Sequence, residues 1–124
     1  MHDFRSLRVL QDAMDLVEEV YQVSKHFPDT EKFGLTSQIR RSSVSVPSNI
    51  AEGASRNSPA EFRHFLGIAS GSGGELLTQL MLAQRLGFVE EASISPCIEK
   101  IEVINRMTSK LIHSLSKQSL VLST

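Results

Sequence analysis

The stretch Glu61–Gly87, EFRHFLGIASGSGGELLTQLMLAQRLG, decides the fold because it predicts one long amphipathic helix. Its apolar and small residues recur at steps of four and three, which places them on one face of an α-helix. We expect this stripe to face the core of a helical bundle. It comprises Phe62, Leu66, Ala69, Gly73, Leu76, Leu80, Ala83 and Gly87.

The opposite face of the same helix carries unusually small residues. Gly67, Gly71, Gly74 and Thr78 also follow one another at steps of four, three and four. Glycine inside a helix costs about 1 kcal/mol relative to alanine, and a solvated face normally carries Glu and Lys. Close approach of a second backbone would explain these glycines, so we interpret this face as a contact with another copy of the chain.

Length and composition set the protein class. The chain has 124 residues, which suggests one domain spanning residues 1–124. Its net charge of −1 gives no overall bias toward nucleic acid or membranes, although residues 32–89 hold six Lys or Arg against three Asp or Glu. A single cysteine, an acidic N-terminus unlike a signal peptide and the lack of a long apolar run predict a cytoplasmic protein.

Periodicity predicts helices along the whole chain and no strands. We expect helices over about residues 6–25, 30–56, 59–86 and 94–117. Short connections make consecutive helices antiparallel neighbours. The fold class is therefore all-α, an antiparallel up-down-up-down four-helix bundle that assembles into a homo-oligomeric ring.

Capping residues mark the helix ends. Ser58 followed by Pro59 and Glu61 predicts a capping box at the start of the third helix, and Gly87 its C-terminal stop. We expect the second helix to begin at Asp29 or Thr30 and the fourth at Ser93 or Ser95. These last four residues are all good helix caps.

The first two helices also have more apolar or small surface than one core stripe needs. On the first helix, Met14 and Tyr21 belong to the expected core stripe with Leu7, Leu10 and Val17. The stripe is widened to about half the circumference by Val9, Ala13, Leu16, Val20 and Val23. Packing between two neighbours of its own bundle and burial against a further molecule both explain this width. On the second helix, Val44, Ser48 and Ala51 lie opposite the core, and we assign them to the same subunit interface as the glycines.

No constellation of residues indicates catalysis, a metal or a cofactor. Glu61 and His64 form one Glu-x-x-His, whereas di-iron bundles need two such motifs and two further Glu. The glycine-rich segment 71–75 lacks the lysine and the preceding strand of a phosphate-binding loop. Cys97, in the first turn of the fourth helix, has apolar neighbours, which favours the core over a reactive thiol.

A group of arginines is the candidate binding surface. Arg40, Arg41, Arg56 and Arg63 all fall on the two middle helices. Because the planar guanidinium pairs well with phosphates, and a ring would repeat the group, we assign them to nucleic-acid binding. The alternative is that they form ion pairs across helices with acidic residues, namely Glu52, Glu61 or Glu75.

Three segments together resemble a known family. They are Phe27-Pro28 with Phe33-Gly34-Leu35, QIRRSSVSVPSNIAEGASR (Gln38–Arg56) and EFRHFLGIASGSGGELLTQLMLA (Glu61–Ala83). Over roughly residues 5–117 the chain resembles the four-helix-bundle proteins encoded within bacterial 23S ribosomal RNA intervening sequences. That family is related to the accessory variability determinant of diversity-generating retroelements, a basic pentamer that binds a reverse transcriptase and nucleic acid.

The resemblance implies a small cytoplasmic bundle that forms a homopentamer, and no established enzyme class. The retroelement relative is strongly basic, whereas this chain is not. Two functions follow as hypotheses: a non-enzymatic oligomeric module that binds RNA or a nucleoprotein through the repeated arginines, or a protein-interaction scaffold that binds no nucleic acid. Neither needs a membrane or a cofactor.

Overall fold

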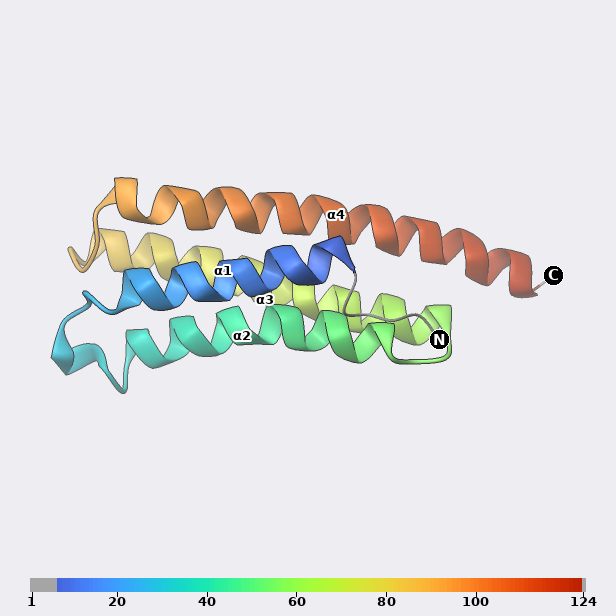
Figure 1. The fold of residues 1–124 in the computed structure, drawn as a ribbon, viewed down its shortest axis with the longest axis horizontal. Helices are drawn as coiled ribbons and strands as arrows, with labels where there is room; N and C mark the ends of the chain where they lie inside the picture. Colours follow the sequence, from blue (N-terminus) through green and yellow to red (C-terminus); the bar gives the residue numbers. More distant parts are fainter. Residues whose placement is uncertain (1–6, 124) are drawn as a thin grey trace.

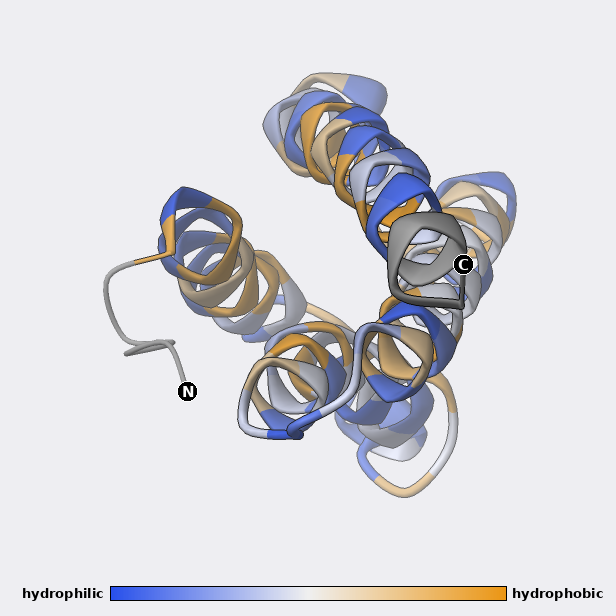
Figure 2. Ribbon diagram, turned by 90° about the vertical axis from the view of Figure 1, so that its right-hand side faces the viewer, coloured by the Kyte–Doolittle hydropathy of each residue, from blue (hydrophilic) through white to orange (hydrophobic). Residues whose placement is uncertain are grey.

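The protein folds as four long helices around one hydrophobic core. The structure, a computed structural model, describes residues 7–123 and the side chains of residues 7–118. The helices are α1 (Arg8–Ser24), α2 (Leu35–Ala54), α3 (Pro59–Arg85) and α4 (Glu91–Ser123), with a short 3-10 helix, η2 (Asp29–Glu31), before α2. Each α-helix packs against the next and α4 packs against α1, so that they surround a common interior (Figures 1 and 2). Residues 7–123 contain no strand, and the predicted all-α four-helix bundle is confirmed.

The core contains most of the stripe predicted for α3, although Phe62 is only partly buried and Gly87 is exposed. Leu66, Leu76 and Leu80 of α3 are completely buried. Each such side chain contributes about 1.5–3 kcal/mol relative to an exposed one. The residues of the other helices that are buried to a similar degree include Leu16, Ile39, Ile50, Ile94, Ile101 and Ile104.

Helix α3 begins and ends where its capping residues predict. The backbone N–H of Glu61 donates to Ser58 Oγ at 3.2 Å, with Pro59 in the first turn. In a full capping box the Glu61 carboxylate would also accept the backbone N–H of Ser58. Here this carboxylate instead lies 3.8 Å from Nη1 of Arg56. At the other end Gly87 has a φ of 79°, and the Phe88 N–H donates to Ala83 O at 3.0 Å. This is the six-to-one bond of a Schellman motif.

The predicted starts of α2 and α4 are wrong. Asp29 and Thr30 lie in η2, and α2 begins only at Leu35. The carboxylate of Glu31 accepts the backbone N–H of Leu35 at 3.1 Å, which satisfies a donor that the helix itself cannot. Helix α4 begins at Glu91, a turn earlier than expected, and continues to Ser123, past the predicted end at 117. Figure 1 shows its C-terminal part running beyond the other helices.

Helix α1 lies between α2 and α4, which accounts for its wide apolar arc. Its predicted start at residue 6 lies outside the described residues. Two residues of the expected core stripe are not buried: Met14 is 48% exposed and Tyr21 38%. They lie on the edge of the arc, so α1 leaves apolar surface on the outside of the bundle.

Candidate functional site

The predicted arginine group is divided between two ends of α2. Arg40 and Arg41 lie in the second turn of α2, whereas Arg56 follows its last residue and Arg63 is in the first turns of α3. At a rise of 1.5 Å per residue, about 20 Å of helix separates Arg41 from Ala54. One chain therefore presents two separate pairs of arginines rather than one cluster.

Arg56 is occupied by neighbours within the chain. Its guanidinium forms ion pairs with Glu52 and Glu61, and it lies 5.0 Å from the centroid of the Phe65 ring. The carboxylates are about half exposed, so the pairs add little stability, but they offset the charge of Arg56. Arg56 therefore forms ion pairs with acidic residues, which was the alternative to its assignment to nucleic-acid binding.

Arg40 is held against α1, and among residues 7–118 it has no acidic partner. Its Nε donates to Ser24 Oγ at 2.8 Å and its Nη2 donates to Tyr21 O at 3.4 Å. The guanidinium carbon lies 4.5 Å from the centroid of the Tyr21 ring, which is within the range of a cation–π contact. Arg40 thus joins α2 to α1 and keeps its positive charge.

Arg41 and Arg63 are the two members that remain available. Arg41 is exposed and Arg63 half-buried. Within residues 7–118, neither side chain has an ion pair or a hydrogen bond. Of the four predicted arginines, they therefore have the most capacity to bind a phosphate.

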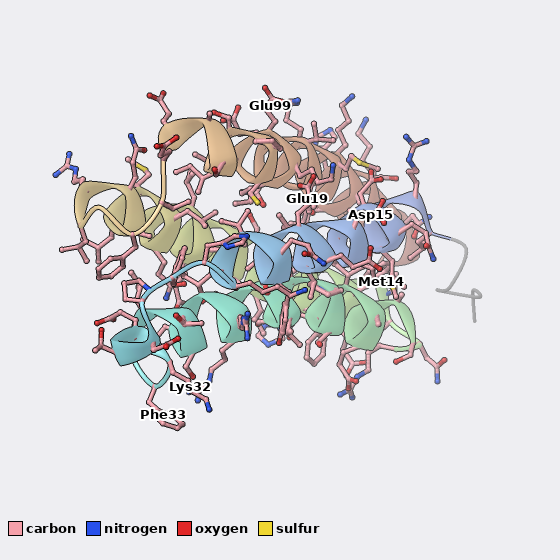
Figure 3. All side chains as sticks on the ribbon, turned by 60° about the vertical axis from the view of Figure 1, so that its left-hand side comes forward. Met14, Asp15, Glu19, Lys32, Phe33 and Glu99 are labelled. Carbon is pink, nitrogen blue, oxygen red and sulfur yellow. The ribbon has the colours of Figure 1, made fainter. Side chains whose placement is uncertain are left out.

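A hollow between α1 and α2 gathers basic and aromatic side chains that sequence reasoning missed. It measures about 500 Å³ and contains Arg40 and Arg41. Phe33, at its edge, is 91% exposed. Figure 3 shows Phe33 and Lys32 projecting outward from the connection between α1 and α2. The other lining residues are Tyr21, Lys32, Thr36, Ser37 and Val44.

Acidic residues gather on a different side of the bundle. Asp12, Asp15 and Glu99 line a hollow of about 310 Å³ between α1 and α4 together with two basic residues. Figure 3 shows Asp15 and Glu99 on this side. Nearby, Lys100 Nζ lies 3.6 Å from Glu19 Oε1. The charges are thus unevenly distributed, and the described residues that line the α1–α2 hollow include three cations and no carboxylate.

The predicted interface residues lie on the outside of the chain. Val44 is 40% exposed, Ser48 and Thr78 are exposed, and Ala51 is half-buried because it also packs against the core. An added Cβ would meet nothing within 4 Å at three glycines of α3, Gly67, Gly71 and Gly74. The glycine face is therefore open within one chain.

Cys97 and His64 are the other residues that were weighed for chemistry. Cys97 is buried in the core as expected, and burial followed by the negative charge of Glu19 raises the pKa of its thiol to about 11. His64 lies edge-on to Phe65, with ring centroids 5.3 Å apart. Among the described residues, no group of three His, Cys, Asp or Glu has metal-binding geometry, and no helix is long and apolar enough to cross a membrane.

Comparison with known proteins gives one family and one fold. The sequence model of the family described as 23S rRNA-intervening sequence protein matches residues 5–110. A crystal structure of a protein of unknown function from the S23 ribosomal protein family of Bacteroides thetaiotaomicron has a TM-score of 0.78 and 23% identity, covering 84% of this chain and 97% of that one. At that identity the likeness concerns the fold alone. No curated protein matches the chain.

Proposed function

Since the chain belongs to the family of 23S rRNA-intervening sequence proteins, we propose that it is a non-enzymatic cytoplasmic module that assembles into a ring, most simply a homopentamer, and binds RNA or a nucleoprotein. The observation that carries the proposal is the pair of available cations, Arg41 and Arg63, on the two helices whose outer faces are made of small residues. The number of subunits comes from the family resemblance.

Assembly is supported by the character of the α2 and α3 outer faces. Gly67, Gly71 and Gly74 leave a flat strip on which another backbone can approach closely, because no described residue lies within 4 Å of a Cβ added at these positions. Val44 adds an exposed apolar side chain on the neighbouring helix. The two faces lie on different helices, so a head-to-tail contact between them forms a ring when its rotation closes.

Binding to a polyanion is supported by the arginines and their number in a ring. A chain of net charge −1 has too little charge for tight RNA binding through Arg41 and Arg63 alone. Each contact between an arginine and a phosphate releases counterions from the RNA, and the resulting gains in binding free energy add up. A ring repeats the two arginines in every subunit, so it can bind RNA more tightly than a single chain.

A salt titration tests this function. We expect a fluorescein-labelled RNA to bind micromolar protein at about 50 mM salt and to dissociate steeply by about 200 mM. Replacing Arg41 or Arg63 by Gln is expected to weaken binding. It should also make the salt dependence less steep, by roughly one phosphate contact for each arginine replaced. Arg106→Gln, on the exposed side of α4, is the matched control and is expected to change neither. RNA that stays free at about 50 mM salt refutes the proposal.

A protein-interaction scaffold is the second candidate, and one observation favours it. The C-terminal end of α3 exposes three large apolar side chains: Met81 at 48%, Leu82 at 45% and Leu86 at 54%. A partner protein would cover such a surface. Copurification from a lysate separates the two functions, because partners removed by nuclease support RNA binding and partners that resist nuclease support the scaffold.

A further inference from the structure

The α1–α2 hollow combines cationic and aromatic side chains. Its only ionisable side chains besides Tyr21 are the cations of Lys32, Arg40 and Arg41. Its volume of about 500 Å³ falls within the range of about 300–1,000 Å³ of small-ligand sites. Phe33 and Tyr21, which also line the hollow, add two aromatic rings, and Phe33 is 91% exposed. A ligand that carries both negative charge and a flat ring system would use all of these groups.

The backbone next to Phe33 is held in position, although its ring is exposed. It lies between η2 and the first residue of α2. The N–H of Gly34 donates to Glu31 O at 3.0 Å, and the N–H of Leu35 donates to the Glu31 carboxylate at 3.1 Å, which fixes the backbone on its C-terminal side. Lys32 Nζ lies 5.4 Å from the centroid of the Phe33 ring. With the ring 91% exposed, a second flat group has room to stack on it.

Arg40 is also oriented before any ligand binds. Its Nε and Nη2 are engaged by Ser24 and Tyr21, and its guanidinium lies over the Tyr21 ring. A guanidinium has five N–H donors, so Nη1 remains available to the hollow. A preorganised donor loses less conformational freedom on binding than a free side chain does. Arg40 is therefore suited to hold a phosphate rather than only to join two helices.

We propose that the hollow binds single-stranded RNA, with one unstacked base on Phe33 and its flanking phosphates on Lys32, Arg40 and Arg41. This inference rests on the proposed RNA binding and narrows it to single strands. In a duplex the bases are stacked on one another and cannot reach an aromatic side chain, whereas unpaired bases commonly stack on Phe and Tyr. The hydroxyls of Thr36 and Ser37 lie in the lining and can bond the edges of the base.

Fluorescence anisotropy of a labelled 12-nucleotide oligouridylate tests the proposal against an RNA duplex of the same length. The change is Phe33→Ala, with Phe33→Trp as the variant that keeps a stacking ring. Val103→Ala is the matched control, because Val103 is an exposed apolar residue of α4 away from the hollow. Light scattering and circular dichroism follow the mass and helix content of each protein.

We expect Phe33→Ala to bind the single strand about 5- to 150-fold more weakly, which corresponds to the loss of one base–aromatic stack. Phe33→Trp and Val103→Ala are expected to retain wild-type affinity, and the affinity for the duplex is expected to be weak and unchanged in all proteins. The mass and helix content of Phe33→Ala should equal those of the wild type.

Three results overturn the inference. Equal affinity of Phe33→Ala and wild type for the single strand shows that no base stacks on Phe33. An equal loss for the duplex shows that stacking is not the cause. A lower mass for Phe33→Ala shows that Phe33 contacts another copy of the chain instead. In each case the proposed function survives if Arg41→Gln still weakens RNA binding, whereas a wild-type protein that binds no RNA refutes both.

Discussion

Adding a methyl group to the glycine face of α3 should have opposite effects on the fold and on the assembly. Gly71 and Gly74 are exposed, and a Cβ added at either position meets no atom of the chain within 4 Å. Alanine is favoured over glycine in a helix interior by about 1 kcal/mol. Each Gly→Ala change is therefore expected to stabilise a separate chain by about 1 kcal/mol, and the double change by about 2 kcal/mol.

In the proposed ring the same methyl groups meet the neighbouring subunit. If two backbones approach closely over Gly71 and Gly74, alanine weakens the contact and leucine abolishes it. We expect Gly71→Leu or Gly74→Leu to yield lower-mass species by light scattering, while circular dichroism shows the helix content of the wild type. Urea unfolding of the dissociated Gly71→Ala/Gly74→Ala protein at low concentration should show the gain in stability.

Gly53 provides the matched control inside the chain. A Cβ there would lie 2.8 Å from Phe65 Cβ and 3.2 Å from Phe62 O, so α2 and α3 must move apart to admit it. Gly53→Ala should therefore destabilise the fold at every protein concentration. An intact oligomer in both leucine variants would refute the reasoning, because it would show that solvent and not a second chain lies over the glycine face.

Two further predictions concern stability. Ser58→Ala removes the bond that Ser58 Oγ accepts from Glu61 N–H, and urea unfolding should show a loss of about 1 kcal/mol; Ser58→Asp should restore it. The pKa of the Cys97 thiol is raised from 9.0 to about 11, so the stability that it contributes is complete below pH 9 and is lost as the pH rises through 11, by about 2–3 kcal/mol in all. The free energy of unfolding of Cys97→Ala should therefore fall less between pH 8.5 and about 11 than that of the wild type, and parallel pH profiles would contradict this.

Local signals in the sequence were sufficient to predict α3. Its start depends on Ser58 and Pro59 and its end on Gly87, and all three act through bonds to adjacent residues. The core stripe was also predictable, because Leu66, Leu76 and Leu80 follow the helical period and no buried charge interrupts it. Burial of a strongly periodic stripe leaves few alternatives to a bundle.

The connection between α1 and α2 could not be predicted in the same way. Asp29 and Thr30 are good helix caps, and nothing in their type distinguishes a 3-10 turn from the start of an α-helix. The outcome depends on Glu31, whose carboxylate bonds the N–H of Leu35 and moves the helix start beyond Gly34. Because Phe33 was placed inside a helix, its position at the edge of the hollow was missed.

The arginine group shows a different limit. Arg56 and Glu52 are four residues apart, a spacing that favours an ion pair on a helix, and this pairing was among the alternatives. The contact of Arg40 with Tyr21 joins two helices and follows only from their packing. Sequence therefore identified the basic segment, whereas the tertiary structure determines which of its cations remain available.

The mass of the native protein in solution tests the proposed assembly most directly. Light scattering during size-exclusion chromatography, at micromolar concentration, should give about five times the chain mass of 13.7 kDa. A mass of 13.7 kDa at that concentration would mean that the glycine face of α3 is exposed to solvent in the working protein, and it would contradict both the ring and the repeated arginines on which RNA binding depends.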